Sequence, residues 1–365
     1  MRASIVATLV ALMLAGAPAA PAQTGGTATP PLSVFSYPMS GWMDTWGPAS
    51  QGYDWTVRKA LGDLVDLATW TPNVANHPLL DPELGPFITL LHEARVWRGI
   101  TRLASNTVPA NAVRLVKFYS SGWAIQVKDA NGDPFAIMVD FSDGPFAPGP
   151  GAPGLVPLTP PQLDALANQL DAYFISHSHI DHISPYLMYR MLLDGKLVVA
   201  PLEVKIQALL GGYPNAQNIV SPSTSAPIQF GPLSFRVFSG WQYGSFLDPA
   251  QTIPDPNDPF NVQNNAYVFQ MNGATIAHFG DNNDPGILTF SDDLMQTGWT
   301  PDICLNLGSY YTALGNLFQP QLRFHSHDLE FHHFGNAFLL EQISQAGPVN
   351  LRRVLFWGEY MDVVP

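Results

Sequence analysis

The spacing of apolar residues changes near residue 110. Before this point, apolar residues recur at helical spacing in two stretches, 57–68 and 87–103, and Pro109 ends the second stretch. From Val113 onward the period becomes two, which predicts strands. The pattern therefore divides the chain into a helical extension at 23–110, which begins with a flexible lead-in, and a strand-rich domain at 111–365.

Two hairpins are predicted in the strand-rich domain. Asn131-Gly132 joins alternating segments at 123–127 and 135–140, and Asn-Gly is a strong signal for a tight hairpin turn. The sequence Met271-Asn272-Gly273 likewise separates two apolar segments that we expect to be strands, 265–270 and 274–281. A further alternating strand is expected at 233–238, and a short one at 301–307.

Helices and strands alternate between the two hairpins. Thr159-Pro160-Pro161-Gln162 has the residues of a capping box with proline at the first helical position, which predicts the start of a helix. A strand is expected at 173–176, a helix at 183–193 and another strand at 196–200. This order predicts an α/β layer architecture.

Four potential metal ligands follow the apolar run at 173–175, namely His177, His179, Asp181 and His182. Alternate residues of an extended chain share one side, so the first three are expected to point the same way before His182 turns off at the next helix. Imidazole nitrogen and carboxylate oxygen bind Zn²⁺, Fe and Mn, and two ions roughly 3.5–4 Å apart can share one attacking water. The alternative is a polar loop with chance histidines.

The spacing His-x-His-x-Asp-His resembles the signature of the metallo-β-lactamase superfamily of metal-dependent hydrolases. The resemblance implies a four-layer αββα sandwich in which His177 and His179 bind one metal, and Asp181 and His182 bind the second. Asp181 would also orient the attacking water and is the candidate catalytic residue. The family's early strands end in an aspartate that supports the metal loop, which implies this role for Asp140, although a strand-end cap is the alternative.

Two later segments extend the resemblance. A strand closing in Gly280-Asp281 resembles the motif whose aspartate bridges the two metals, and His278 is implied to support the site without binding metal. The segment 329–335 resembles the closing motif, which favours His333 over His332 as a ligand. The pattern is most similar to the branch that contains ascorbate-phosphate lactonases and N-acyl phosphatidylethanolamine phospholipases.

One histidine of the family pattern is missing, because no histidine occurs from residue 183 to residue 277. The strand in the right place runs into Gln242, whose amide oxygen is a poorer ligand for Zn²⁺ than imidazole. We therefore expect a weak first metal site, completed by Gln242, a water or a histidine from 325–333, beside a fuller second site. Further candidates for contacting substrate or assisting the leaving group are Tyr310, Tyr311, His327 and His332.

Composition restricts the partners and the compartment. The 365 residues carry a formal charge of −13, which disfavours a nucleic-acid partner. Residues 1–22 have the charge, the apolar run and the small residues of a signal peptide, which predicts secretion or export to the periplasm. No later stretch is apolar enough to predict a membrane span, and the only cysteine, Cys304, is expected to lie in a buried strand.

These observations predict a secreted hydrolase that uses one or two divalent metals, zinc first and manganese or iron as alternatives. The resemblance implies that a metal-bound hydroxide attacks an ester, lactone or phosphodiester in a small-molecule or lipid-like substrate. Two other functions stay open: an exported binding protein that kept the fold and lost catalysis, and an iron-dependent oxidoreductase on the same fold.

Overall fold

The computed structural model describes residues 84–144, 158–222, 225–242, 262–281, 294–305, 318–324, 352–353 and 358–365. Several predictions lie outside these residues. They concern the signal peptide at 1–22, the lead-in and first helix of the extension, Tyr310, Tyr311, and the histidines at 325–333.

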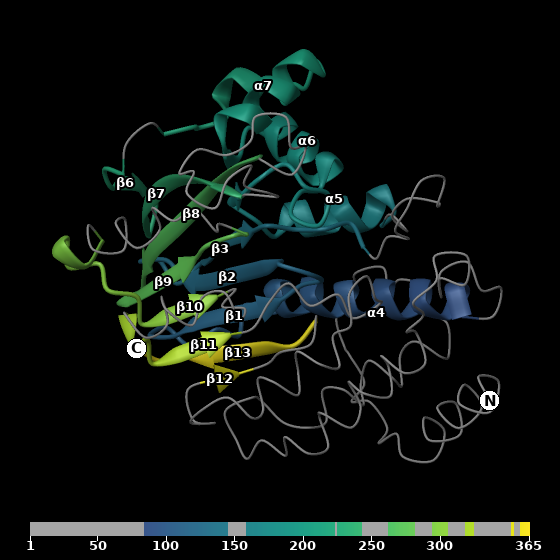
Figure 1. The fold of residues 1–365 in the computed structure, drawn as a ribbon. Helices are drawn as coiled ribbons and strands as arrows, with labels where there is room; N and C mark the ends of the chain where they lie inside the picture. Colours follow the sequence, from purple (N-terminus) through teal and green to yellow (C-terminus); the bar gives the residue numbers. More distant parts are fainter. Residues whose placement is uncertain are drawn as a thin grey trace, which may run out of the picture.

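Two mixed sheets stack against each other (Figure 1). The first sheet has the order β13–β1–β2–β3–β4–β5, with the bounds β1 Val113–Lys117, β2 Trp123–Lys128, β3 Pro134–Val139, β4 Ala172–Phe174, β5 Leu197–Val199 and β13 Tyr360–Val363. The second has the order β12–β11–β10–β9–β8–β7–β6, with the bounds β6 Ile228–Phe230, β7 Leu233–Gln242, β8 Val262–Met271, β9 Ala274–His278, β10 Ile303–Leu305, β11 Leu322–Phe324 and β12 Arg352–Arg353.

Each sheet is antiparallel on one side and parallel on the other. In the first sheet β13, β1, β2 and β3 are antiparallel, whereas β3, β4 and β5 are parallel. In the second sheet β6 to β9 are antiparallel and β9 to β12 are parallel. Because parallel strands end at the same edge of a sheet, side chains that follow β3 and β4 meet there.

Helices cover the outer face of the first sheet. Their bounds are α4 Leu84–Ala104, α5 Pro160–Asn168, α6 Pro185–Leu193 and α7 Leu202–Leu210, and a short 3-10 helix η3 covers Ala216–Asn218. Figure 1 shows α4 beside β1, and α5, α6 and α7 grouped near the other end of the sheet. In β3, Ala136 and Met138 pack with the helices whereas Ile137 and Val139 pack between the sheets, as the period of two requires.

Most of the predicted elements in the described residues are confirmed. The second helix of the extension is α4, and the two predicted hairpins are β2–β3 and β8–β9. Cys304 lies buried in β10, where burial raises the pKa of its thiol. The predicted strand at 233–238 continues further, because β7 pairs with β8 up to Gln242. The helix α7 and the strands β6, β11 and β13 were not predicted from the sequence.

Aromatic packing and two hydrogen bonds fix the end of β4 against the second sheet. The Phe174 ring lies 5.0 Å from the Phe235 ring and 4.9 Å from the Phe269 ring, in edge-to-face contacts. The Tyr267 hydroxyl donates to the carbonyl of Ile175. The amide of Asn265 donates to the Ser176 carbonyl over 2.8 Å. The segment after β4 therefore starts from a fixed position between the sheets.

A buried arginine attaches β13 to β1. Arg114 donates from Nε to Asp362 Oδ1 over 2.7 Å and from Nη2 to Asp362 Oδ2 over 2.8 Å. Its Nη1 donates to the hydroxyl of Thr107 over 3.0 Å, and its guanidinium lies 4.5 Å from the centre of the Tyr360 ring. A bidentate pair of arginine and carboxylate is directional as well as strong.

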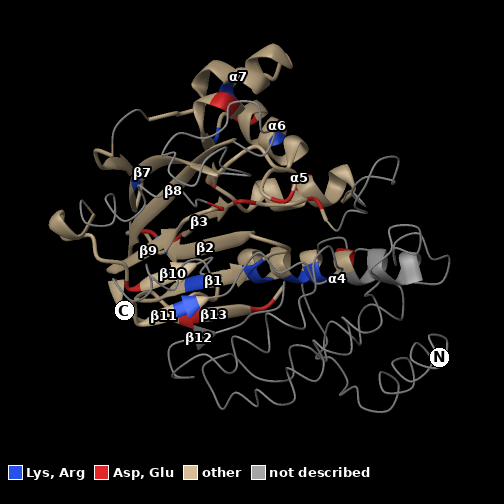
Figure 2. Cartoon of the chain, viewed as in Figure 1, with Lys and Arg blue, Asp and Glu red and all other residues tan. Residues whose placement is uncertain are grey.

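Three of the basic residues on α4 and β1 are buried. Figure 2 shows Lys and Arg on α4, β1 and β11, while most of the described ribbon carries no charge. Arg95, Arg114 and Lys117 are all buried, so these side chains are not available to a phosphate backbone. Among the described residues, no helix has both the length and the apolar character that a membrane crossing requires.

Removing the carboxylate of Asp362 should destabilise the protein strongly, because it leaves the buried Arg114 charge uncompensated. We expect Asp362→Ala to lower the free energy of unfolding by about 3 kcal/mol in urea denaturation. Asp194→Ala is the matched control, since Asp194 accepts from Arg190 over 3.1 Å in an exposed pair on α6, worth at most about 0.5 kcal/mol. Equal losses in the two variants would contradict the role given to this pair.

Candidate metal centre

Four strand ends bring the predicted site residues together at one edge of the two sheets. Asp140 directly follows β3, and the histidine motif follows β4. Asp281 comes three residues after β9, and Gln242 is the last residue of β7. The site therefore lies between the two sheets, with side chains from both.

The histidine motif is a turn and not an extended strand, so the predicted alternation of side chains is wrong. The strand β4 ends at Phe174, and the chain closes on itself where the amide of His182 donates to the His179 carbonyl over 2.9 Å. The turn brings His177 and His182, five residues apart, to a ring separation of 4.0 Å. The helix α6 then begins at Pro185. The Ser184 hydroxyl caps it by accepting a hydrogen bond from the amide of Leu187.

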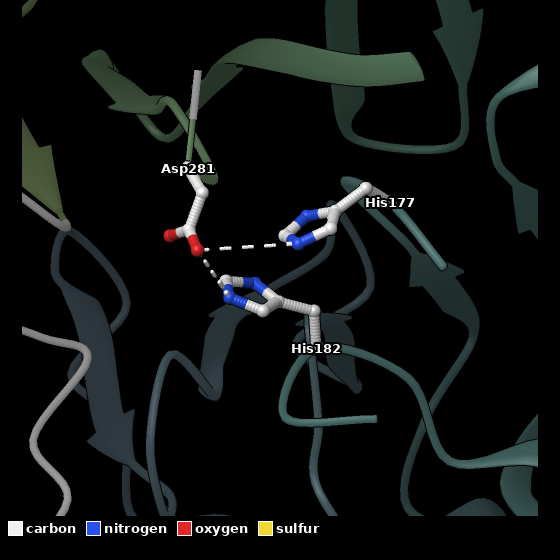
Figure 3. A group of neighbouring side chains, drawn as sticks. All are labelled: His177, His182 and Asp281. Atoms are coloured by element: carbon white, nitrogen blue, oxygen red, sulfur yellow. Dashed lines mark ion pairs between the residues drawn. The ribbon is translucent and has the colours of Figure 1, made fainter. Parts of the chain in front are cut away.

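Three side chains form a compact group of potential ligands (Figure 3). His182 Nε2 lies 3.3 Å from Asp281 Oδ2, and His177 Nε2 lies 4.0 Å from the same oxygen. All the ligand atoms of this group are within 4.8 Å of one another. Figure 3 shows both imidazoles directed at the Asp281 carboxylate. This spacing fits ligands around one small ion.

The buried carboxylate of Asp140 fixes the orientation of both imidazoles. Asp140 Oδ2 accepts from His182 Nδ1 over 2.7 Å and from the Ser176 hydroxyl over 2.8 Å. The Ser176 oxygen in turn lies 2.9 Å from His177 Nδ1. Because this hydroxyl donates its proton to Asp140, it accepts from His177. Both Nδ1 atoms are therefore donors, and each Nε2 atom faces the site.

The electrostatics of the two histidines differ sharply. Burial and, to a smaller extent, the neighbouring His182 lower the pKa of His177 to about 3. Burial would also lower the pKa of His182, yet the carboxylates of Asp281, Asp181 and Asp140 raise it well above its ordinary value. These three carboxylates lie within 4 Å of one imidazole. Such a concentration of negative charge favours a cation.

The Asn264 side chain fixes the backbone around Asp281. Its amide donates to Asn264 Oδ1 over 3.0 Å, while Asn264 Nδ2 donates to the carbonyl of Phe279 over 3.0 Å. Gly280 has a φ of +56°, and a Cβ atom there would lie 2.6 Å from both Asn264 Oδ1 and Ser176 Cβ. Only glycine fits at this position, because the Cβ atom of every other residue would collide with Ser176, in the loop that follows β4. This loop, residues 175–182, is called the metal loop below.

The other predicted residues surround this group. The His179 ring lies 4.7 Å from the His177 ring, and Asp181 Oδ2 lies 3.7 Å from His182 Nε2. Gln242 Nε2 donates to Asp281 Oδ2 over 3.3 Å, and its Oε1 is buried with no hydrogen-bond partner in the described part of the chain. The structure thus places Gln242 beside Asp281.

His278 supports the site from behind. Its Nδ1 accepts from the amide of Gly280 over 3.2 Å, so the proton is on Nε2, which donates to the Ser121 carbonyl over 3.3 Å. Burial lowers its pKa, and Nε2 lies 3.9 Å from Asp140 Oδ2. Since both ring nitrogens are engaged with protein atoms, His278 is not placed as a ligand.

The residues fit a divalent metal ion. His177 Nε2 is buried, faces the site and has no hydrogen-bond partner within the described segments. An unpaired buried nitrogen is costly unless something binds it. Imidazole nitrogens together with carboxylate oxygens form a donor set typical of zinc, manganese and iron sites.

Three residues at the site were not predicted from the sequence. Ser176 adjoins the motif and could have been found there, since a hydroxyl beside a ligand often orients it. Asn264 and Ser121 had no local signal. They reach the site because β8 begins, and the β1–β2 turn lies, at the edge where β3 and β4 end.

Comparison with known proteins identifies the fold. No family model matches the sequence, and no curated protein matches it either. Among solved structures, an isothiocyanate hydrolase from Delia radicum gut bacteria is 18% identical with a TM-score of 0.50, covering 69% of this chain and 99% of that one. With its two stacked mixed sheets and outer helices, the chain has the metallo-β-lactamase fold.

Two further structures are similar at lower scores. The metallo-β-lactamase fold protein YhfI from Bacillus subtilis is 13% identical with a TM-score of 0.45, covering 69% of this chain and 100% of that one. A possible metal-dependent hydrolase from Veillonella parvula is 11% identical with a TM-score of 0.47, covering 70% and 100%.

Asp140→Asn should weaken metal binding, because an amide at this position cannot accept from both Ser176 and His182 with the same strength. We expect zinc affinity to fall roughly 10- to 100-fold in chelator competition. Asp133→Asn, in the exposed β2–β3 turn, is the control and should bind zinc like the wild type. Unchanged affinity in Asp140→Asn would remove Asp140 from the support of the ligands.

Gln242→His should strengthen the weaker metal site, because imidazole binds Zn²⁺ better than an amide does. We expect one tightly held metal per wild-type chain and a second that is lost on mild dialysis. The variant should retain more of the second metal, as counted by elemental analysis after the same dialysis. Two equally tight metals in the wild type would show that another residue already completes the first site.

Proposed function

We propose that the chain is a metal-dependent hydrolase whose centre is built on His177, His182 and Asp281. The observation that carries this proposal is the convergence of their ligand atoms within 4.8 Å, with the Nε2 atom of each histidine directed inward by Asp140. Such prior orientation lowers the cost of ordering ligands when an ion binds. The metallo-β-lactamase fold supports the proposal, but a fold alone does not determine a reaction.

The residues of the chain have separate tasks in this proposal. A bound divalent ion would supply a Lewis acid and an activated water at neutral pH. His177, His179, Asp181, His182 and Asp281 would hold the metal, and the Asp181 carboxylate would also orient the attacking water. Asp140 and Ser176 keep the imidazoles in one tautomer. The fixed backbone of Asp281, held by Asn264, maintains the spacing between the two sheets' contributions.

We propose an ester, lactone or phosphodiester as the substrate, in a small-molecule or lipid-like compound. Two exposed apolar side chains support a substrate with apolar parts. Ile180, between the ligands His179 and Asp181, is 46% exposed, and Trp241, next to Gln242, is 42% exposed. Apolar groups beside polar reacting atoms are typical of small-molecule sites. The branch of lactonases and phospholipases, and export through the 1–22 signal peptide, belong to the same proposal.

Asp181→Asn tests the proposal directly. Wild-type protein should hydrolyse members of a panel of chromogenic esters, lactones and phosphodiesters, lose this activity when a chelator removes the metal, and regain it when zinc or manganese is added. Asp181→Asn should lose at least 100-fold of the activity, about 2.7 kcal/mol of barrier, while circular dichroism shows an intact fold. Asp133→Asn is again the control.

Three outcomes would count against the proposal. Activity of Asp181→Asn within tenfold of wild type would exclude Asp181 from the mechanism. Protein that holds metal and hydrolyses nothing would favour a binding protein. Protein purified with stoichiometric iron, without hydrolysis, would favour an oxidoreductase on the same ligands.

A further inference from the structure

The turn between β1 and β2 lies beside the metal centre and has an unusual backbone. The amide of Phe118 donates to the Gly122 carbonyl over 2.8 Å, and the amide of Gly122 donates to the Tyr119 carbonyl over 3.1 Å. Ser120 and Ser121 are the central residues of this tight turn. Ser120 has a φ of +55°, a left-handed conformation usually taken by glycine in hairpin turns. Such conformations cluster at functional sites.

A buried lysine holds the turn in this conformation. Lys117 is fully buried, and its ammonium donates to the carbonyls of Phe118 and Ser120. It also lies 5.5 Å from the centre of the Trp123 ring. Burying an ammonium group is costly, and here the hydrogen bonds to these two carbonyls offset part of that cost. The same bonds stabilise the conformation of the turn.

The position of Ser121 is fixed from the opposite sheet as well. His278 Nε2 donates to the Ser121 carbonyl over 3.3 Å, and His278 lies on the strand that leads to Asp281. The Ser121 hydroxyl then lies 3.5 Å from His182 Nε2, the atom that faces the metal group. The side chain is buried.

The distances match those between neighbouring ligands of one ion. Two ligand atoms about 2.1 Å from a tetrahedral ion lie roughly 3.4 Å apart. The distance from His182 Nε2 to Asp281 Oδ2 is 3.3 Å, and the distance from the same nitrogen to the Ser121 hydroxyl oxygen is 3.5 Å. The Ser121 hydroxyl oxygen therefore lies about as far from His182 Nε2 as the Asp281 carboxylate oxygen does.

We propose that Ser121 is an additional residue of the metal centre, whose hydroxyl gives a neutral oxygen ligand to the ion held by His182 and Asp281. This inference rests on the proposed function, because it requires a metal at this site. A neutral ligand adds no charge to the three carboxylates already present, and a hydroxyl is weaker than imidazole. Its contribution should therefore be a modest gain in affinity for the ion on the His182 side.

The test uses Co²⁺ as a spectroscopic probe in the wild type and in Ser121→Cys. If residue 121 faces the ion, the new thiolate should bind it and give an intense near-ultraviolet charge-transfer absorption. The wild type should lack this absorption, since its only thiol, Cys304, is buried in β10. Ser120→Cys is the matched control. The Ser120 hydroxyl makes no hydrogen bond within the described residues, and the proposed ligand is its neighbour Ser121. It should also lack the absorption.

A second measurement separates ligation from a structural role. Ser121→Ala should lose about tenfold in Co²⁺ affinity by chelator competition, while the unfolding midpoint of the metal-free protein stays within the error of the wild type. Cobalt-loaded Ser121→Cys without the absorption, or the same absorption in Ser120→Cys, would overturn the inference. Failure of the wild type to bind Co²⁺, Zn²⁺ or Mn²⁺ would instead overturn the proposed function and, with it, the role of Ser121.

Discussion

The arrangement of the site depends on one buried carboxylate, that of Asp140. It has no exposure to solvent, yet it is kept ionised: burial raises its pKa, but His182, His278 and His177 together bring the pKa below its ordinary value. Its backbone has a φ of +47°, which aspartate tolerates better than most residues. Because both carboxylate oxygens accept hydrogen bonds from the metal loop, this conformation lets β3 determine the position of residues that follow β4.

The candidate metal centre therefore depends on residues from both sheets. The loop after β4 is fixed by Asp140 on one side and, through Tyr267 and Asn265, by β8 on the other. Asp281 takes its position from the second sheet, and its carboxylate approaches the loop of the first sheet, where His182 Nε2 lies 3.3 Å from Oδ2. Gly280 also passes close to Ser176. A relative movement of the sheets would separate the imidazoles of His177 and His182 from the Asp281 carboxylate. The aromatic contacts of Phe174 oppose that movement.

Local patterns were enough to predict the elements that local chemistry determines. The Asn131-Gly132 turn, the helix start at Thr159 and the cluster of potential ligands after β4 all follow from neighbouring residues. The geometry of the motif did not follow, because the turn at 175–182 is closed by contacts with Asp140 and with β8. Ser121 could not be predicted either, since its role depends on a pairing of β1 with β2 and on a hydrogen bond from His278.

The pairing of β13 with β1 joins residues about 250 positions apart, for example Val113 with Val363. Contacts so distant in sequence are slow to form, because a long loop must close before they contribute. During synthesis, the edge of β1 that pairs with β13 therefore lacks this partner until β13 has been made, and unpaired edges invite aggregation. The native first sheet, and the support it gives to the loop after β4, can therefore be completed only once residues 360–363 have been synthesised.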